Sequence, residues 1–175
     1  MTRPDLLLIG HGSRNPAATE EFDRLVQQLT AAAPDLRVGA GFLELADPPI
    51  DAAVDRLVAE GATDVVAVPY VLFGAGHLKD DGPAVLARAR ARHPGVRFRL
   101  ARDVGLHPAV LDVAEDRART ALKRLPDTDS TAVVLVSRGS TDPDACADFV
   151  KFARLLEDGR GLGRVEAAFV AMTRP

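Results

Sequence analysis

Two histidines and one glutamate each lie close to the end of a predicted strand, although they are far apart in the chain. His11 and Glu44 follow the first and second predicted strands, and His77 lies in the glycine-rich loop after the third. Parallel strands place their carboxyl ends at one edge of a sheet, which is where ligands bind. Two imidazoles and a carboxylate suit Co²⁺, Fe²⁺, Ni²⁺ or Zn²⁺, and three protein ligands would leave the coordination sphere open. The alternative is structural, because a histidine after a strand can cap a helix and a loop histidine can face water.

The elements that would position these side chains alternate along the chain. Short apolar runs predict strands, and apolar residues at helical spacing predict helices between them. We expect strands at 5–10, 37–45, 64–69 and 96–100, and helices at 15–33, 48–61, 82–93 and 107–124, with a loop at 70–80. This alternation predicts an α/β fold, a flavodoxin-like parallel sheet with helices on both faces.

The chain also predicts an internal repeat. The segment 8–16 aligns without a gap with 135–143, so that His11 faces Arg138 and Glu44 faces Ala171. We therefore expect a first domain at 1–125 that carries the metal site and, at 131–175, the first part of a second, degenerate copy that stops early. A homodimer, or a partner that completes the second domain, follows as an expectation.

Composition excludes several classes of protein. The 175 residues are 47% hydrophobic with a net charge of −3, which argues against nucleic acid or an anionic membrane as the main partner. No apolar run approaches the roughly 20 residues that span a bilayer. A single cysteine, Cys146, excludes an internal disulfide and favours a reducing cytoplasm.

Common nucleotide motifs are missing. The chain has no phosphate-binding loop, and Gly10-His11-Gly12 lacks the third glycine of a dinucleotide fingerprint, so neither ATP nor another nucleotide is expected. Of the other histidines, His93 ends a predicted helix and is expected to be structural. His107 begins a helix, where it could cap it or support the site.

Three segments together resemble the class II chelatases, the sirohydrochlorin cobaltochelatases and ferrochelatases of cobalamin and siroheme synthesis. They are Leu-Ile-Gly-His-Gly-Ser-Arg at 8–14, Phe-Leu-Glu at 42–44 and Pro-Tyr-Val-Leu-Phe-Gly-Ala-Gly-His-Leu-Lys-Asp-Asp at 69–81. The resemblance implies that His11 and His77 hold the incoming metal ion, with Glu44 as third ligand or proton acceptor. It implies ATP-independent insertion of a divalent ion, Co²⁺ first and Fe²⁺ or Ni²⁺ as alternatives.

The implied substrate, sirohydrochlorin, is a tetrapyrrole rich in carboxylates. Arg14, Lys79 and Arg138 could therefore bind its acidic periphery, arginine being suited to bidentate pairing. Two other functions stay open. One is a tetrapyrrole or metal carrier without turnover. The other is a histidine phosphatase-like hydrolase, which is disfavoured because Gly10 stands where such enzymes have an arginine.

Overall fold

The computed structural model describes residues 3–126 and 130–172, apart from the side chains of His77 and Leu78. In chain order the elements are β1 (Asp5–Gly10), α1 (Pro16–Ala32), β2 (Val38–Phe42), α2 (Ile50–Ala59), β3 (Asp64–Pro69), α3 (Gly76–Arg92), β4 (Arg97–Leu100), α4 (Pro108–Leu122), β5 (Val133–Ser137), α5 (Pro143–Arg160) and β6 (Val165–Phe169). Within this described part of the chain, no helix combines the length and apolar character needed to cross a membrane.

The first sheet is parallel throughout and has the order β2-β1-β3-β4. β1 is the central strand between β2 and β3, as Leu8 shows by pairing with Ala40 on one side and Val68 on the other. The chain order reverses beside β1, which makes the carboxyl end of this strand the expected ligand position. The segments that follow β1, β2 and β3 therefore emerge at one edge.

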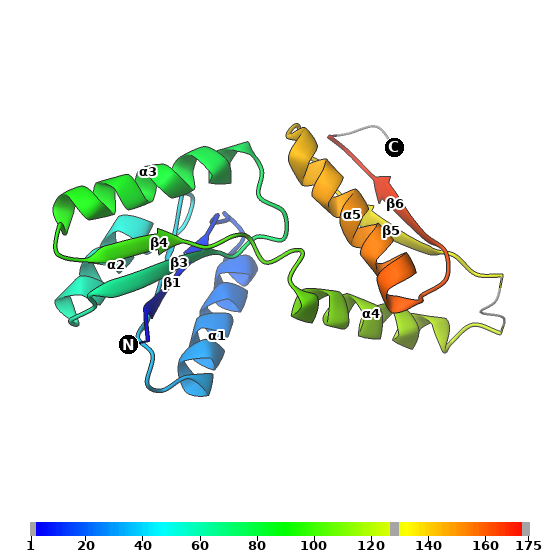
Figure 1. Ribbon diagram of the computed structural model, residues 1–175, viewed down its shortest axis with the longest axis horizontal. Helices are drawn as coiled ribbons and strands as arrows, with labels where there is room; N and C mark the ends of the chain where they lie inside the picture. Colours follow the sequence, from blue (N-terminus) through cyan, green and yellow to red (C-terminus); the bar gives the residue numbers. More distant parts are fainter. Residues whose placement is uncertain (1–2, 127–129, 173–175) are drawn as a thin grey trace. The chain divides into compact units, whose positions relative to one another are not determined.

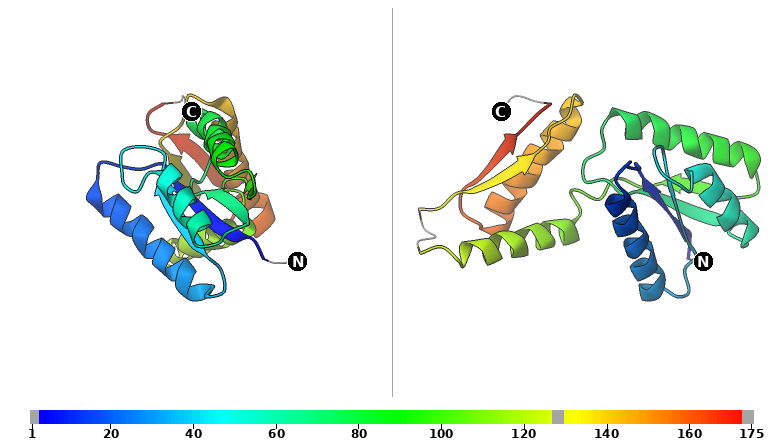
Figure 2. Two further views of the ribbon diagram at one scale, coloured as in Figure 1. Left: turned by 90° about the vertical axis from the view of Figure 1, so that its left-hand side faces the viewer. Right: turned by 180° about the vertical axis from the view of Figure 1, so that it is seen from behind.

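Helices cover both faces of this sheet, as Figures 1 and 2 show. Alternate residues of β1 point to opposite faces. Leu8 packs with Phe22 of α1, whereas Leu7 and Ile9 are buried with residues of α2 and α3. Burying each such side chain contributes about 1.5–3 kcal/mol relative to exposure. The predicted α/β fold with a parallel sheet and helices on both faces is confirmed.

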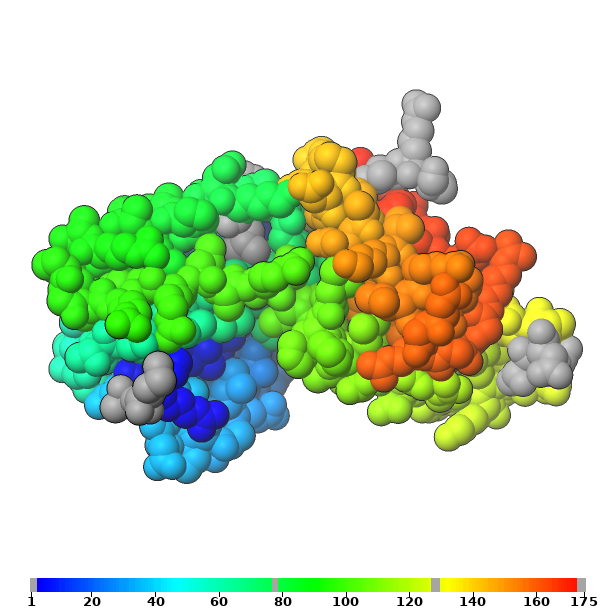
Figure 3. Space-filling view, in the orientation of Figure 1, coloured from blue at the N-terminus to red at the C-terminus, as the bar shows by residue number. Residues whose placement is uncertain are grey.

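A second compact unit comprises Leu72–Gly76 and Val104–Pro175. Here β5 and β6 pair in parallel, and α4 and α5 contribute Leu111, Phe152 and the fully buried Leu156 to one apolar cluster. Figure 3 shows the outer surface of α5, in orange, exposed to solvent. The sequence prediction placed residues up to 125 in the first domain, but the apolar side of α4 packs in the second unit. The predicted division at 1–125 and 131–175 and the predicted repeat stay predictions.

One face of β5 remains apolar and exposed. Val134 and Val136 are 58% and 59% exposed, whereas Leu7 and Ile9, which align with them in the predicted repeat, are buried. The corresponding face of the first sheet is covered by α2 and α3.

Two predicted boundaries were wrong. α3 begins at Gly76 and not at 82, so His77 lies in the first turn of a helix and not in a loop. A proline disfavours helical backbone in the residue before it through a clash with that residue's Cβ, but Gly82, which precedes Pro83, has none. β2 ends at Phe42 rather than at 45: the Leu43 N–H still bonds the Gly10 carbonyl of β1, but Leu45 has φ +63°, which is not an extended conformation.

Candidate metal site

The loops that follow β1 and β2 are held together by their backbones. The Leu43 N–H donates to the Gly10 carbonyl (2.9 Å), and the Glu44 N–H donates to the His11 carbonyl (3.1 Å). Gly12 has φ +97°, and a Cβ atom there would overlap the carbonyl oxygen of Glu44. Glycine is thus required at position 12 both by its backbone conformation and by the close approach of the second loop.

His11 and Glu44 lie together at the carboxyl edge of the sheet. His11 Nε2 lies 3.4 Å from Glu44 Oε1, and the two side chains are 52% and 55% exposed. An imidazole nitrogen and a carboxylate oxygen are donors that a borderline divalent metal accepts. The side chain of His77 lies outside the described residues, and among those that are described no three His, Cys, Asp or Glu side chains form a metal-binding group. The three-ligand site therefore stays a prediction, and the structure shows one pair of it.

The turn after Glu44 is strained. Leu45 has φ +63°, a left-handed conformation that is unfavourable for a residue with a side chain, and it is 48% exposed. Such strain is typical of functional sites, where the surrounding structure imposes it. It directs the chain away from the sheet directly after the carboxylate.

Two pockets adjoin the His11–Glu44 pair. One, of about 300 Å³, is bordered by both side chains, and Phe42, Ile50 and Val85 form its apolar part. The other, of about 210 Å³, lies between His11 and α1, with Phe22 and the half-exposed Tyr70 in its wall. His11 borders both pockets, so a ligand in either one can reach it.

The predicted substrate-binding cations lie on three different segments. Arg14 is in the loop after β1, Lys79 in the first turns of α3, and Arg138 in the loop after β5 of the second unit; all three are exposed. Their role stays a prediction.

The remaining histidines have structural partners. His107 Nδ1 accepts the Ala109 N–H (3.2 Å), so it caps α4, one of the two roles predicted for it. His93 Nε2 lies 2.7 Å from Asp55 Oδ1 and links the end of α3 to α2. The hydrogen bond with His93 lowers the pKa of the Asp55 carboxyl, and the charge of Arg92 lowers it further.

Sequence analysis did not single out Asp51, Asp81 and Arg88, which line the 300 Å³ pocket together with His11 and Glu44. Arginines alternate along the second half of α3, and their spacing alone does not show which one faces the pocket. Asp51 stands in the first turn of α2, a position that acidic residues often occupy for the helix dipole.

A family model described as CbiX matches residues 5–121 and 132–175. The chain belongs to the CbiX family. Among curated relatives of this CbiX chain, the sirohydrochlorin cobaltochelatase of Priestia megaterium is 35% identical over 172 residues, which cover 97% of the chain and 56% of the relative. The sirohydrochlorin ferrochelatase of Bacillus subtilis (strain 168) is 30% identical, covering 97% of the chain and 64% of the relative.

Solved structures give the same result. SirB from Bacillus subtilis with Fe³⁺ superposes with a TM-score of 0.88 at 29% identity, over 99% of this chain and 68% of that one. SirB from Bacillus subtilis subspecies spizizenii, a sirohydrochlorin chelatase in complex with cobalt, gives 0.75 at 30% identity, over 95% and 67%. The predicted resemblance to class II chelatases is confirmed, and the chain spans between half and two thirds of the length of the two curated relatives.

Proposed function

We propose that this CbiX chain inserts a divalent metal ion into sirohydrochlorin, with Co²⁺ as the expected ion and Fe²⁺ or Ni²⁺ as alternatives. The observation that carries the proposal is the His11–Glu44 pair, 3.4 Å apart at the carboxyl edge of a parallel sheet. Its chemistry suits the metals named in the relatives' descriptions, cobalt and iron. The family match favours this function over the histidine phosphatase.

In the proposed reaction the metal ion is a substrate. The His11 nitrogen and the Glu44 carboxylate, with His77 as the predicted third ligand, hold it until the macrocycle arrives. Four bonds to the ring nitrogens form, two of them in place of the departing N–H protons, as the bonds to His11, Glu44 and His77 break. The released Glu44 carboxylate would accept one proton, and the other would pass to water. No phosphoryl transfer is involved, so ATP is not required.

The exposure of the pair fits a site that must release its metal. His11 and Glu44 are each about half exposed, with solvent or substrate able to reach both. A site that stores a structural metal is instead usually closed, with four protein ligands. An open site with few protein ligands exchanges its ion more easily. Arg14, Lys79 and Arg138 remain the proposed contacts for the acidic periphery of the substrate.

The test follows the absorption spectrum of sirohydrochlorin with Co²⁺ in the presence of the protein. We expect insertion faster than the spontaneous reaction, and loss of that excess rate in His11→Ala. The matched control is His107→Asn, which removes an exposed imidazole while asparagine retains the helix cap. Near wild-type turnover in a folded His11→Ala variant would contradict the proposal.

The carrier is the second candidate, because the half-exposed His11–Glu44 pair could bind a metal ion without inserting it. It predicts binding of the tetrapyrrole and the metal with no more than one insertion per protein. An excess of substrate over protein separates the two: a chelatase converts many equivalents, and a carrier stops after one.

A further inference from the structure

We infer that Arg88 binds a carboxylate of the tetrapyrrole inside the 300 Å³ pocket beside the metal pair. The inference rests on the proposed function and assigns one contact of that site. Arg88 borders the same pocket as His11 and Glu44, on the opposite wall formed by α3 and the start of α2.

The Arg88 guanidinium is held in place by Asp51. Its Nη2 lies 3.2 Å from Asp51 Oδ2 and its Nε lies 3.3 Å from the same oxygen. Within the described part of the chain these are its polar contacts, and they use one edge of a group that has five N–H donors. The Nη1 edge is left to bind an anion, and the side chain is 52% exposed.

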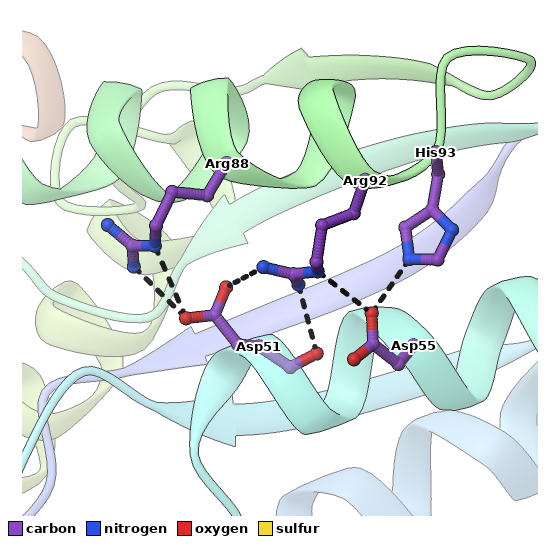
Figure 4. Close-up of polar contacts among 5 residues, drawn as sticks. All are labelled: Asp51, Asp55, Arg88, Arg92 and His93. Carbon is purple, nitrogen blue, oxygen red and sulfur yellow. Dashed lines mark hydrogen bonds and ion pairs between the residues drawn. The ribbon is translucent and has the colours of Figure 1, made fainter.

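A second arginine, Arg92, also contacts the Asp51 carboxylate, as Figure 4 shows. Arg92 Nη1 contacts Asp51 Oδ1 at 3.0 Å, and Arg92 Nε contacts Asp55 Oδ1 at 3.2 Å. His93, directly after α3, also contacts Asp55, so Arg88, Arg92 and His93 together bind two carboxylates of α2. Because Asp51 is fixed by Arg92, it orients Arg88 without depending on Arg88 for its own position.

The charges of the pocket agree with a bound metal and a bound acid. Asp51 and Asp55 pair with Arg88 and Arg92, and Glu44 is a further acid of the lining. A divalent ion at His11 and Glu44 offsets the negative charge of Glu44. The carboxylate arm would therefore enter next to Arg88 more favourably once the metal is bound, which orders the substrates.

The size and lining of the pocket suit one carboxylate-bearing side chain of the tetrapyrrole rather than the whole macrocycle. Its 300 Å³ is at the small end of ligand pockets, which run from about 300 to 1,000 Å³. Phe42, Ile50 and Val85 are nearly fully buried and supply an apolar wall for the methylene part of an acidic arm. Binding there would fix the direction of the macrocycle over the metal.

The test compares Arg88→Ala and Arg88→Lys with Arg24→Ala. Arg24 is an equally helical arginine, 59% exposed and paired with acids of α1, and it does not line either pocket. The first measurement is the affinity for cobalt-loaded sirohydrochlorin, followed by absorption, which needs no turnover. We expect Arg88→Ala to weaken it about tenfold or more, Arg88→Lys to weaken it less, and Arg24→Ala to leave it unchanged.

The second measurement separates this inference from the proposed function. Arg88→Ala should raise KM for sirohydrochlorin while leaving kcat and the affinity for Co²⁺ alone close to wild type. If the wild type fails to insert Co²⁺ but Arg88→Ala still weakens binding of the metallated tetrapyrrole, the proposed function fails and the inference stands. The inference is wrong if Arg88→Ala, Arg88→Lys and Arg24→Ala all bind the metallated tetrapyrrole as the wild type does. It is also wrong if Arg88→Ala lowers only kcat. If Arg88→Ala does not fold, Arg88→Lys and a folded Arg88→Gln take its place. The inference is wrong if both of them bind cobalt-loaded sirohydrochlorin as tightly as the wild type does.

Discussion

Gly12 offers the sharpest test of how the fold positions the metal pair. In Gly12→Ala the new Cβ would overlap the Glu44 carbonyl oxygen and lie 2.8 Å from its carbonyl carbon. Ordinary carbon contacts are about 3.5–4.0 Å, so the two loops must separate by about 1 Å or more. That movement pulls the Glu44 N–H from the His11 carbonyl and the Leu43 N–H from the Gly10 carbonyl.

The expected cost has two parts. Alanine at a strongly positive φ costs about 1–3 kcal/mol, and each weakened hydrogen bond about 0.5–1.5 kcal/mol. Gly61→Ala is the matched control, because Gly61 has φ +93° but its nearest atom to an added Cβ is a flexible Arg37 nitrogen at 3.7 Å. The control incurs the first cost alone, so Gly12→Ala should be less stable than Gly61→Ala by about 1–3 kcal/mol.

The assay is urea unfolding monitored by circular dichroism, with Co²⁺ affinity measured by calorimetry in parallel. Gly12→Ala should also lose about tenfold or more in Co²⁺ affinity, since the supports of metal ligands typically matter by that factor, and Gly61→Ala should not. Equal stability and equal affinity of the two variants would refute the argument that this contact holds His11 and Glu44 together.

Three further predictions concern the rest of the molecule. Asp55→Asn should destabilise the protein by at most about 1 kcal/mol because Asp55 is half exposed. Since the folded-state pKa of Asp55 is lowered, this contribution is present above the ordinary carboxyl pKa of 3.8 and is lost as pH falls through the folded-state pKa, so urea unfolding of the variant and the wild type should converge in acid. Gly159 lies near the end of α5, with open space where an added Cβ would lie. Gly159→Ala should therefore raise the free energy of unfolding by up to about 1 kcal/mol, measured by thermal unfolding, and a less stable variant would contradict this prediction. Co²⁺ binding should release protons, because metal and protons compete for imidazole; calorimetry that detects no proton release on binding would argue against histidine ligation.

The sequence predicted the frame of the site well because that frame depends on local patterns. The apolar run between Pro4 and His11 identifies β1 directly from the residue types. The parallel topology then places His11 and Glu44 at one edge of the sheet. The cap role of His107, one of the two roles predicted for it, was also recognisable because His107 precedes a proline in a first helical turn.

The rest depended on interactions that a pattern does not contain. Gly74 and Gly76 predicted a loop at 70–80, but α3 begins at Gly76 and continues through Pro83, which places His77 in the helix. Arg88 differs from Arg90 and Arg92 only by the rotation of α3 over the sheet. Arg90 bonds the Phe98 carbonyl, Arg92 bonds two aspartates, and Arg88 borders the pocket, and only the packed structure shows this.

The most direct measurement is a crystal structure of the protein soaked in Co²⁺. The account predicts one ion about 2.0–2.2 Å from both His11 Nε2 and a Glu44 carboxylate oxygen, the range typical of borderline divalent metals. An ion bound elsewhere, or His11 and Glu44 directed to separate positions with Co²⁺ present, would contradict it.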